Sequence, residues 1–201
     1  MKYFVSILLF ILLIGCSQEN KNLSVEKHNS NDTTYGTQLF ESGFLKFADT
    51  LKLDSLKSEL INSFYIYNED NYKIVHIDAE ELAEFSFDFF MPNLNKILKK
   101  REFKLNVQTA NDYENTNDIL INGEKVKLYT KEQLDNGNFW ESASRNFFKE
   151  VNKQLTSKKI EESFYLLYEG NDLHVLLLTA NQYKIIADKY KNETKEIPYL
   201  P

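Results

Sequence analysis

Few side chains in this chain could perform chemistry, and the histidines set the first limit. Three are present, His28, His76 and His174. His76 and Asp78 are two residues apart, so they share one face if the segment is a strand. Such a pair can supply two metal ligands or hold an imidazole in one tautomer. Asp78 also has the type and position of a helix N-cap, and we expect that role, with no metal site and no cofactor.

Carboxylates are abundant, and some are spaced as if for acid–base catalysis. Glu80 and Glu84 are one helical turn apart, and Glu161 adjoins Glu162. General acid–base catalysis needs two carboxyl groups in a shared cleft, where different surroundings separate their pKa values. Nothing in the sequence indicates a cleft. Acids in the first turn of a helix are already explained by their favourable interaction with the helix dipole.

Motifs for nucleophilic catalysis and phosphate binding are absent from the sequence. It contains no G-x-S-x-G segment, no cysteine–histidine pairing and no glycine-rich phosphate loop. The chain has 24 basic and 30 acidic side chains, a formal net charge of −6. Nucleic-acid binding depends on neutralising phosphates with lysine and arginine, so we do not expect nucleic acid as a partner. The sequence favours a binding protein over an enzyme and indicates no catalytic residue.

Aromatic side chains gather within residues 85–91. This short segment holds more large apolar side chains than one helix face can bury, and its polar residues interrupt any continuous apolar stripe. We therefore expect part of the segment to reach the surface as a docking patch, where neighbouring acids steer a basic protein partner. The expected patch consists of Phe87, Phe90, Met91, Glu84 and Asp88.

The only cysteine of the chain, Cys16, ends an apolar run near the N-terminus. Lys2 precedes this run, and Leu13-Ile14-Gly15 lies directly before the cysteine. The run holds about 12 apolar residues, whereas a membrane-spanning helix needs roughly 20. A charged start, a short apolar stretch and a small residue before the cleavage point are typical of a signal peptide. The segment resembles the type II signal peptide, with its lipobox, of bacterial lipoproteins.

The resemblance implies removal of residues 1–15 and attachment of lipid, palmitate included, to the sulfur and amine of Cys16. The protein would then be anchored to a membrane of the bacterial cell envelope. Ser17 follows the cysteine where inner-membrane lipoproteins have aspartate, which favours the outer membrane in a host with two membranes. Cleavage removes Lys2 and no acid, so the formal net charge becomes −7. The folded part would contain no disulfide, and its core alone must stabilise it.

The resemblance covers residues 1–16 only, and the organisation of the rest is read from composition. Residues 16–38 are nearly free of apolar side chains and rich in Asn, Ser, Lys and Thr. Such a segment buries too little apolar surface to offset the entropy of ordering, so we expect a flexible tether. Residues 39–201 follow as a single domain, long enough to bury a core and rich in Phe and Tyr.

A match of the chain with itself at an offset of 100 residues suggests an internal repeat. Residues 63–66 (Ser-Phe-Tyr-Ile) align with 163–166 (Ser-Phe-Tyr-Leu), and Val75 aligns with Val175. Either a partial duplication or a chance similarity of two helix–hairpin–helix units explains the match. In both cases the two valines and the aligned phenylalanines should be buried.

The expected repeat units, about 39–90 and 139–190, each hold a helix, a β-hairpin and a helix that begins at an N-cap. Between the units, Asn122-Gly123 is the strongest hairpin signal, because both central residues of a type I′ turn need positive φ. The sequence predicts an α+β fold, a largely antiparallel sheet with helices packed on it. Strands are expected at 64–67, 72–77, 103–109, 118–121, 125–129, 163–168 and 173–178.

These features favour a lipid-anchored binding or accessory domain that engages another protein at the bacterial envelope. The alternatives are an envelope hydrolase with an unrecognised active site and a small-ligand binder. A concave pocket with converging polar side chains would favour the alternatives, whereas an exposed aromatic patch would favour protein binding. His76 and His174 are expected to be half-exposed and to lie outside the working surface, so replacing either should leave binding intact.

The lipobox generates a prediction about processing. The mature protein should begin at Cys16, carry thioether-linked lipid and partition into detergent, because several acyl chains anchor far more strongly than one. Cys16→Ala should leave the apolar segment uncleaved by the lipoprotein peptidase. Mass spectrometry of the mature N-terminus is the measurement, and an unmodified thiol there would contradict the anchoring.

Overall fold

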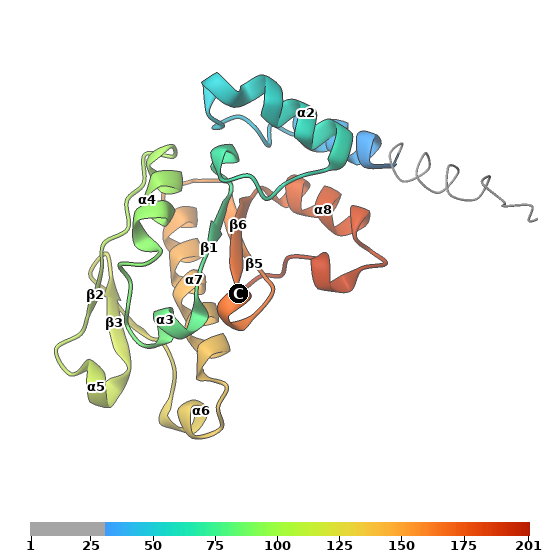
Figure 1. Cartoon of the computed structure of the whole chain (residues 1–201). Coiled ribbons are helices and arrows are strands. Elements are labelled where there is room, and N and C mark those ends of the chain that lie inside the picture. Colours follow the sequence, from blue (N-terminus) through green and yellow to red (C-terminus); the bar gives the residue numbers. More distant parts are fainter. Residues whose placement is uncertain (1–30) are drawn as a thin grey trace, which may run out of the picture.

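The computed structural model describes residues 31–201, where two antiparallel three-stranded sheets and packed helices form the α+β fold that the sequence predicts (Figure 1). Residues 1–30 lie outside the described residues, so Cys16 and the first part of the expected tether do too. Within 31–201, none of the helices has both the length and the apolar character needed to cross a bilayer.

The first sheet is built from apolar strands that meet across a large sequence separation. It consists of β1 (Ile74–His76), β6 (His174–Leu178) and β5 (Ser163–Leu167), in that order. Strands β5 and β6 form a hairpin through η3 (Gly170–Asp172), and Val75 pairs with Val175 across β1 and β6. Apart from their first residues, β5 and β6 are buried at every position, as expected for strands covered on both faces.

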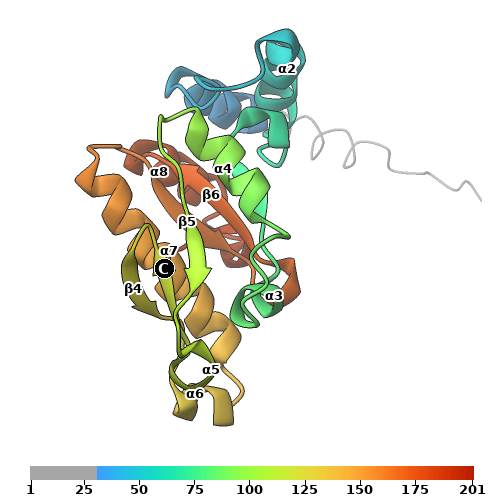
Figure 2. The same cartoon turned by 90° about the vertical axis from the view of Figure 1, so that its left-hand side faces the viewer.

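Helices cover both faces of this sheet (Figure 2). The core around Val75 and Val175 is closed by α3 (Ala79–Ala83), α4 (Met91–Lys99) and α7 (Phe139–Ser157). The core around Ile74 and Leu176 is closed by the helical residues 31–41, α2 (Leu53–Ser63) and α8 (Ala180–Lys189). Successive side chains of one strand point to opposite faces, so each strand contributes to both cores.

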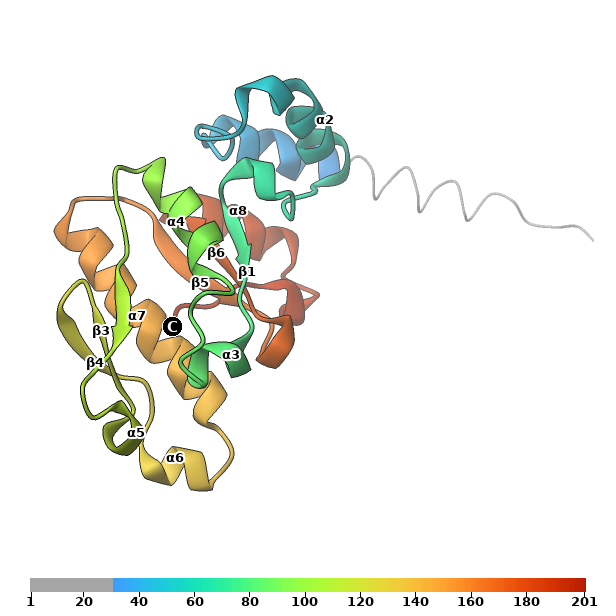
Figure 3. The same cartoon turned by 60° about the vertical axis from the view of Figure 1, so that its left-hand side comes forward.

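The second sheet lies beside α7 (Figure 3). Its order is β2 (Val107–Thr109), β3 (Asp118–Ile121) and β4 (Glu124–Lys127). The turn between β3 and β4 has positive φ at both central residues, 52° at Asn122 and 89° at Gly123. The predicted type I′ hairpin is therefore confirmed.

Short elements connect the sheets and helices. They are η1 (Thr50–Lys52), η2 (Glu69–Asn71), α5 (Tyr113–Thr116), α6 (Lys131–Asp135) and η4 (Thr194–Glu196). Three predicted helix starts are confirmed. The Asp78 carboxylate accepts hydrogen bonds from the backbone N–H groups of Glu80 and Glu81, and α6 and α8 begin with capping boxes.

The predicted tether boundary at residue 38 is wrong, because residues 31–38 belong to the folded domain. Residues 31–41 are helical, and a Cβ added to Gly36 would lie 2.1 Å from the backbone oxygen of Leu60, so only glycine permits this helix contact. Asp32 forms a 2.6 Å ion pair with Lys189, and both side chains are nearly inaccessible. A close backbone contact at Gly36 and the buried ion pair of Asp32 hold residues 31–38 in the domain. Amino-acid composition alone predicts neither contact.

The expected repeat units share one pairing but not an architecture. Val75 pairs with Val175 across β1 and β6. If the two units were related by a local twofold axis, residues 100 apart would face each other in this way. However, residues 64–67 form no strand, since Phe64 ends α2 in the left-handed conformation with φ 48°. A twofold axis that relates β1 to β6 is perpendicular to the sheet, so it would place equivalent helices of the two units on the same face. The helices that precede the strands in the two units, α2 and α7, lie on opposite faces. The two units do not share one architecture, which favours the chance similarity over the partial duplication among the two explanations of the match.

Burial of the aligned phenylalanines is confirmed, and it predicts a large loss of stability on truncation. Phe164 is fully buried against Phe148, with ring centroids 5.3 Å apart. Phe164→Ala should lower the free energy of unfolding by about 3–5 kcal/mol in urea titrations. Phe89, which is 56% exposed, provides the control, and Phe89→Ala should change it by less than about 0.5 kcal/mol. A loss below about 1 kcal/mol for Phe164→Ala would contradict its place in the core.

Candidate functional site

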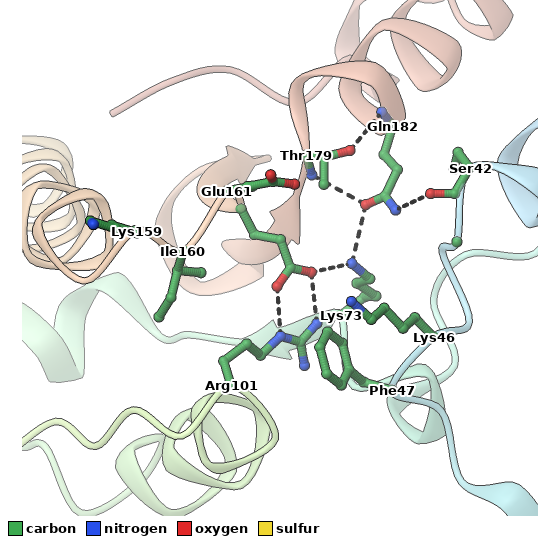
Figure 4. A pocket seen from close by; sticks show the side chains of 12 residues that line it. Ser42, Lys46, Phe47, Lys73, Arg101, Lys159, Ile160, Glu161, Thr179 and Gln182 are labelled. Carbon is green, nitrogen blue, oxygen red and sulfur yellow. Dashed lines mark hydrogen bonds and ion pairs between the residues drawn. The ribbon is translucent and has the colours of Figure 1, made fainter.

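A cavity of about 460 Å³ opens where the ends of several elements meet, and charged side chains line it (Figure 4). A second recess, about 530 Å³ and lined by Tyr35 and residues of α8, has no buried charge among its lining residues. The charged residues of the first cavity are Lys46, Lys73, Arg101, Lys159, Glu161 and Glu162. Its apolar wall includes Phe47 and Ile160.

Each of the buried charged groups comes from the end of a secondary-structure element. Lys73 directly precedes β1, Glu162 directly precedes β5, and Arg101 follows α4. Gln182 lies in the first turn of α8, where it completes the capping box. These side chains lie at the ends of their strands and helices, at the edge of the apolar cores. They can therefore meet without interrupting the apolar packing of either core.

The carboxylate of Glu162 is the centre of a buried ion cluster (Figure 4). It accepts hydrogen bonds from Arg101 Nε at 2.7 Å and Nη2 at 2.8 Å, a bidentate pairing. Its Oε1 also accepts from Lys73 Nζ. The side chains of Glu162, Arg101 and Lys73 are 8%, 2% and 1% exposed respectively. Such a cluster is stable only while every charge keeps its partners.

Backbone and amide groups complete the cluster. Arg101 Nη1 donates to the backbone oxygens of Tyr72 at 3.0 Å and Ile97 at 3.2 Å. Gln182 Oε1 accepts from Lys73 Nζ at 3.1 Å, and Gln182 Nε2 donates to the backbone oxygen of Ser42 at 3.2 Å. The amide of Gln182 thus links the start of α8 to β1 and to the turn that follows residues 31–41.

The surroundings shift the pKa values of the two central groups. Burial lowers the pKa of Lys73 to about 8; Glu162 opposes this effect, and the positive charges of Arg101 and Lys46 add to it. Burial alone would raise the pKa of Glu162, but hydrogen bonds from Arg101 and the charge of Lys73 hold it below its usual range. Glu162 therefore stays ionised at neutral pH, within a site that carries excess positive charge.

The cavity has more cations than the cluster neutralises. Lys46 and Lys159 are exposed at its edge, and neither forms an ion pair with any residue in 31–201. They lie on either side of Arg101 in Figure 4. Four cations against two carboxylates give the cavity a formal charge of +2 in a chain whose net charge is −6. Such a site favours the binding of an anionic group.

The hydroxyl groups that line the cavity form hydrogen bonds with the backbone. Ser42 Oγ donates to the backbone oxygen of Leu39, and Thr179 Oγ1 accepts from the N–H of Gln182. The residues that line the cavity include no histidine to act as a base. Lys73 Nζ is held by Glu162 and Gln182, which ties its position to the ion cluster.

The predicted docking patch is wrong in its central residue. Phe90 is fully buried, with its ring centroid 5.9 Å from that of Phe147, because the residue before α4 points into the core. Phe87 and Met91 are partly buried, whereas Glu84 and Asp88 are exposed. The exposed aromatic residue of this segment is Phe89.

Other predicted residues take their expected structural roles. Asp78 caps α3, and His76 and His174 are half-exposed. Among residues 31–201, no three His, Cys, Asp or Glu side chains come close enough to hold a metal ion.

Sequence reasoning missed the ion cluster, although one signal was present. Lys73 has the same strand parity as Val75 and Ile77, so a charged residue continues an apolar face. A lysine at such a position needs a buried partner. Its partner, Glu162, is 89 residues away, and nothing in the sequence identifies it.

The ion cluster predicts a sharp difference between two adjacent glutamates. Glu162→Gln leaves Lys73 and Arg101 buried without a counter-charge, so the free energy of unfolding should fall by about 3–5 kcal/mol. Glu161 is exposed, and Glu161→Gln should change it by less than about 0.5 kcal/mol. Urea unfolding at neutral pH compares the two, and equal effects would contradict the cluster.

Lys73 also gives the stability a pH dependence of defined sign. Its pKa is about 8 in the folded protein and 10.5 in an ordinary lysine, so the unfolded chain binds more protons between these values. The contribution of Lys73 to the free energy of unfolding therefore rises with pH across that interval. The free energy of unfolding of wild type, minus that of Lys73→Met, should increase by about 2–3 kcal/mol from pH 7.5 to pH 10. A constant difference in urea unfolding would refute the lowered pKa.

Comparison with family models, with curated proteins and with solved structures gives no match for this chain.

Proposed function

We propose that this chain is a lipid-anchored binding protein of the bacterial cell envelope, and that its cavity captures an anionic group between Lys46 and Lys159. The observation that carries the proposal is the positive charge of the cavity in an otherwise acidic chain. The anchoring rests on the lipobox resemblance of residues 1–16.

The cations of the cavity differ in whether they are already paired with a carboxylate, and this difference indicates the ligand chemistry. Lys73 and Arg101 are both paired with Glu162 in the buried cluster. Lys46 and Lys159 are free to pair with a carboxylate or phosphate that enters the cavity. Phe47 and Ile160 offer apolar contact beside that charge. The volume of about 460 Å³ is within the range of small-ligand sites.

The charge distribution restricts the size of the anion. The net charge of −6 disfavours an extended polyanion, whereas the recessed cavity carries excess positive charge. The proposed ligand is therefore a small anion or a single acidic group on a partner protein. The sequence led us to expect a basic protein partner at the aromatic patch, whereas the positive charge of the cavity favours an acidic group on a partner.

Binding is favoured over the alternative of an envelope hydrolase. A concave pocket with converging polar groups is common to both functions. However, a hydroxyl nucleophile needs an adjacent base, and within residues 31–201 neither Ser42 nor Thr179 hydrogen-bonds through its hydroxyl to a basic side chain. The sequence contains no known catalytic motif, and the residues that line the cavity likewise favour a site that binds.

The proposal is tested with Lys46→Gln and Lys159→Gln, separately and together. Isothermal titration with acetate, succinate and inorganic phosphate should show saturable binding of at least one of them to wild type. Each variant should weaken that binding about tenfold, as expected for the loss of one charge-assisted contact of roughly 1.4 kcal/mol. The affinity should also fall with salt.

A matched control keeps the overall charge change the same. Lys131 is an exposed lysine at the start of α6 and does not line the cavity, so Lys131→Gln should bind like wild type. Equal weakening in the control would mean that net charge alone attracts the anion. An acidic peptide of five residues provides a further arm, and its binding in preference to the small anions would assign the site to a protein partner.

A further inference from the structure

His76 and His174 form a direct pair across β1 and β6. Backbone hydrogen bonds join Leu177 N–H to the oxygen of Lys73 and Ile77 N–H to the oxygen of Leu173. The two histidines therefore occupy a non-hydrogen-bonded position of the antiparallel ladder, where opposed side chains approach most closely. Their ring centroids are 4.9 Å apart.

Each imidazole is oriented by a backbone carbonyl of the same loop. His76 Nε2 lies 2.7 Å from the oxygen of Asn171, and His174 Nδ1 lies 2.8 Å from the oxygen of Asp172. A carbonyl can only accept, so these two nitrogens carry the protons in the neutral rings. The opposite nitrogens, Nδ1 of His76 and Nε2 of His174, keep their lone pairs, and no residue in 31–201 hydrogen-bonds to them. This is how proteins prepare histidines as metal ligands.

The spacing of the rings agrees with a shared ion. A metal–nitrogen bond of about 2.0–2.1 Å places the metal roughly 3.2 Å from each ring centroid. Two imidazoles bound at angles between square-planar and tetrahedral then have centroids about 4.5–5.2 Å apart. The observed 4.9 Å falls inside this interval.

We propose that His76 and His174 form a two-imidazole site for a divalent transition-metal ion. Imidazole nitrogen suits Cu²⁺, Ni²⁺ and Zn²⁺, and Cu²⁺ binds most tightly in this series. Water completes the coordination, because described carboxylates do not join the pair. The neighbouring hydroxyl of Tyr168 donates to Glu196 at 2.6 Å and is not free to bind.

The site is accessible and separate from the cavity. Both histidines are half-exposed, with the rings of Phe89 and Tyr168 at their sides, each 6.1 Å from the nearer imidazole. Neither histidine lines the cavity around Glu162. A bound ion would cross-link β1 to β6, so metal should stabilise the fold by binding only the native state.

The test uses the full chain in detergent with Cys16→Ser, so that no thiol competes for metal. Titration with CuCl₂, NiCl₂ and ZnCl₂ should show one saturable site, tightest for Cu²⁺, with a rise in Tm. His76→Ala and His174→Ala should each weaken Cu²⁺ binding at least tenfold and abolish the Tm rise. His28→Ala is the control and should behave like the parent, because its histidine is not part of the pair.

A second measurement needs no substitution in the pair. Substoichiometric Cu²⁺ should broaden the ring proton NMR signals of His76 and His174 before that of His28. Broadening of His28 first, equal Cu²⁺ affinity in all three histidine variants, or the absence of saturable Cu²⁺ binding would overturn the proposal. Anion binding by the cavity should be unchanged in His76→Ala, which separates this result from the fate of the proposed function.

Discussion

The buried carboxylate of Glu162 joins three parts of the chain that are distant in sequence. Arg101 reaches it from the end of α4, and Lys73 reaches it from the start of β1. A buried ion pair contributes little net stability when compared with an apolar replacement, but it is costly to break. Glu162 therefore acts mainly on specificity, since only the native arrangement of α4, β1 and β5 satisfies all three charges.

The cavity is a consequence of that constraint. The ends of the elements that supply the cluster must come together, and their side chains keep the space between them polar. Gln182 donates a hydrogen bond to the backbone oxygen of Ser42, in the turn after the helical residues 31–41. This contact connects that helix to the ion cluster. An anion bound at Lys46 would therefore contact the part of the domain that follows the proposed membrane anchor.

The register of β1 and β6 determines that the two histidines meet. Pairing of Val75 with Val175 places His76 opposite His174, whereas a slip of β1 by one residue would move His76 to the face opposite that of His174. Because both faces are buried, the end of β1 and the start of β6 are where these polar rings can be half-exposed. The offset match that suggested a duplication thus coincides with a strand pairing, although the surrounding helices do not follow it.

The sequence by itself determined the α+β class, the caps at Asp78, Thr130 and Thr179, and the hairpin at Asn122-Gly123. These features depend on contacts within a few residues, so local patterns are sufficient to predict them. Only the tertiary structure decided the burial of Phe90, the helical packing of residues 31–38, the cluster around Glu162 and the histidine pair. Their partners lie far away in the chain, and which residues meet is set by strand register and helix packing, which no local pattern encodes.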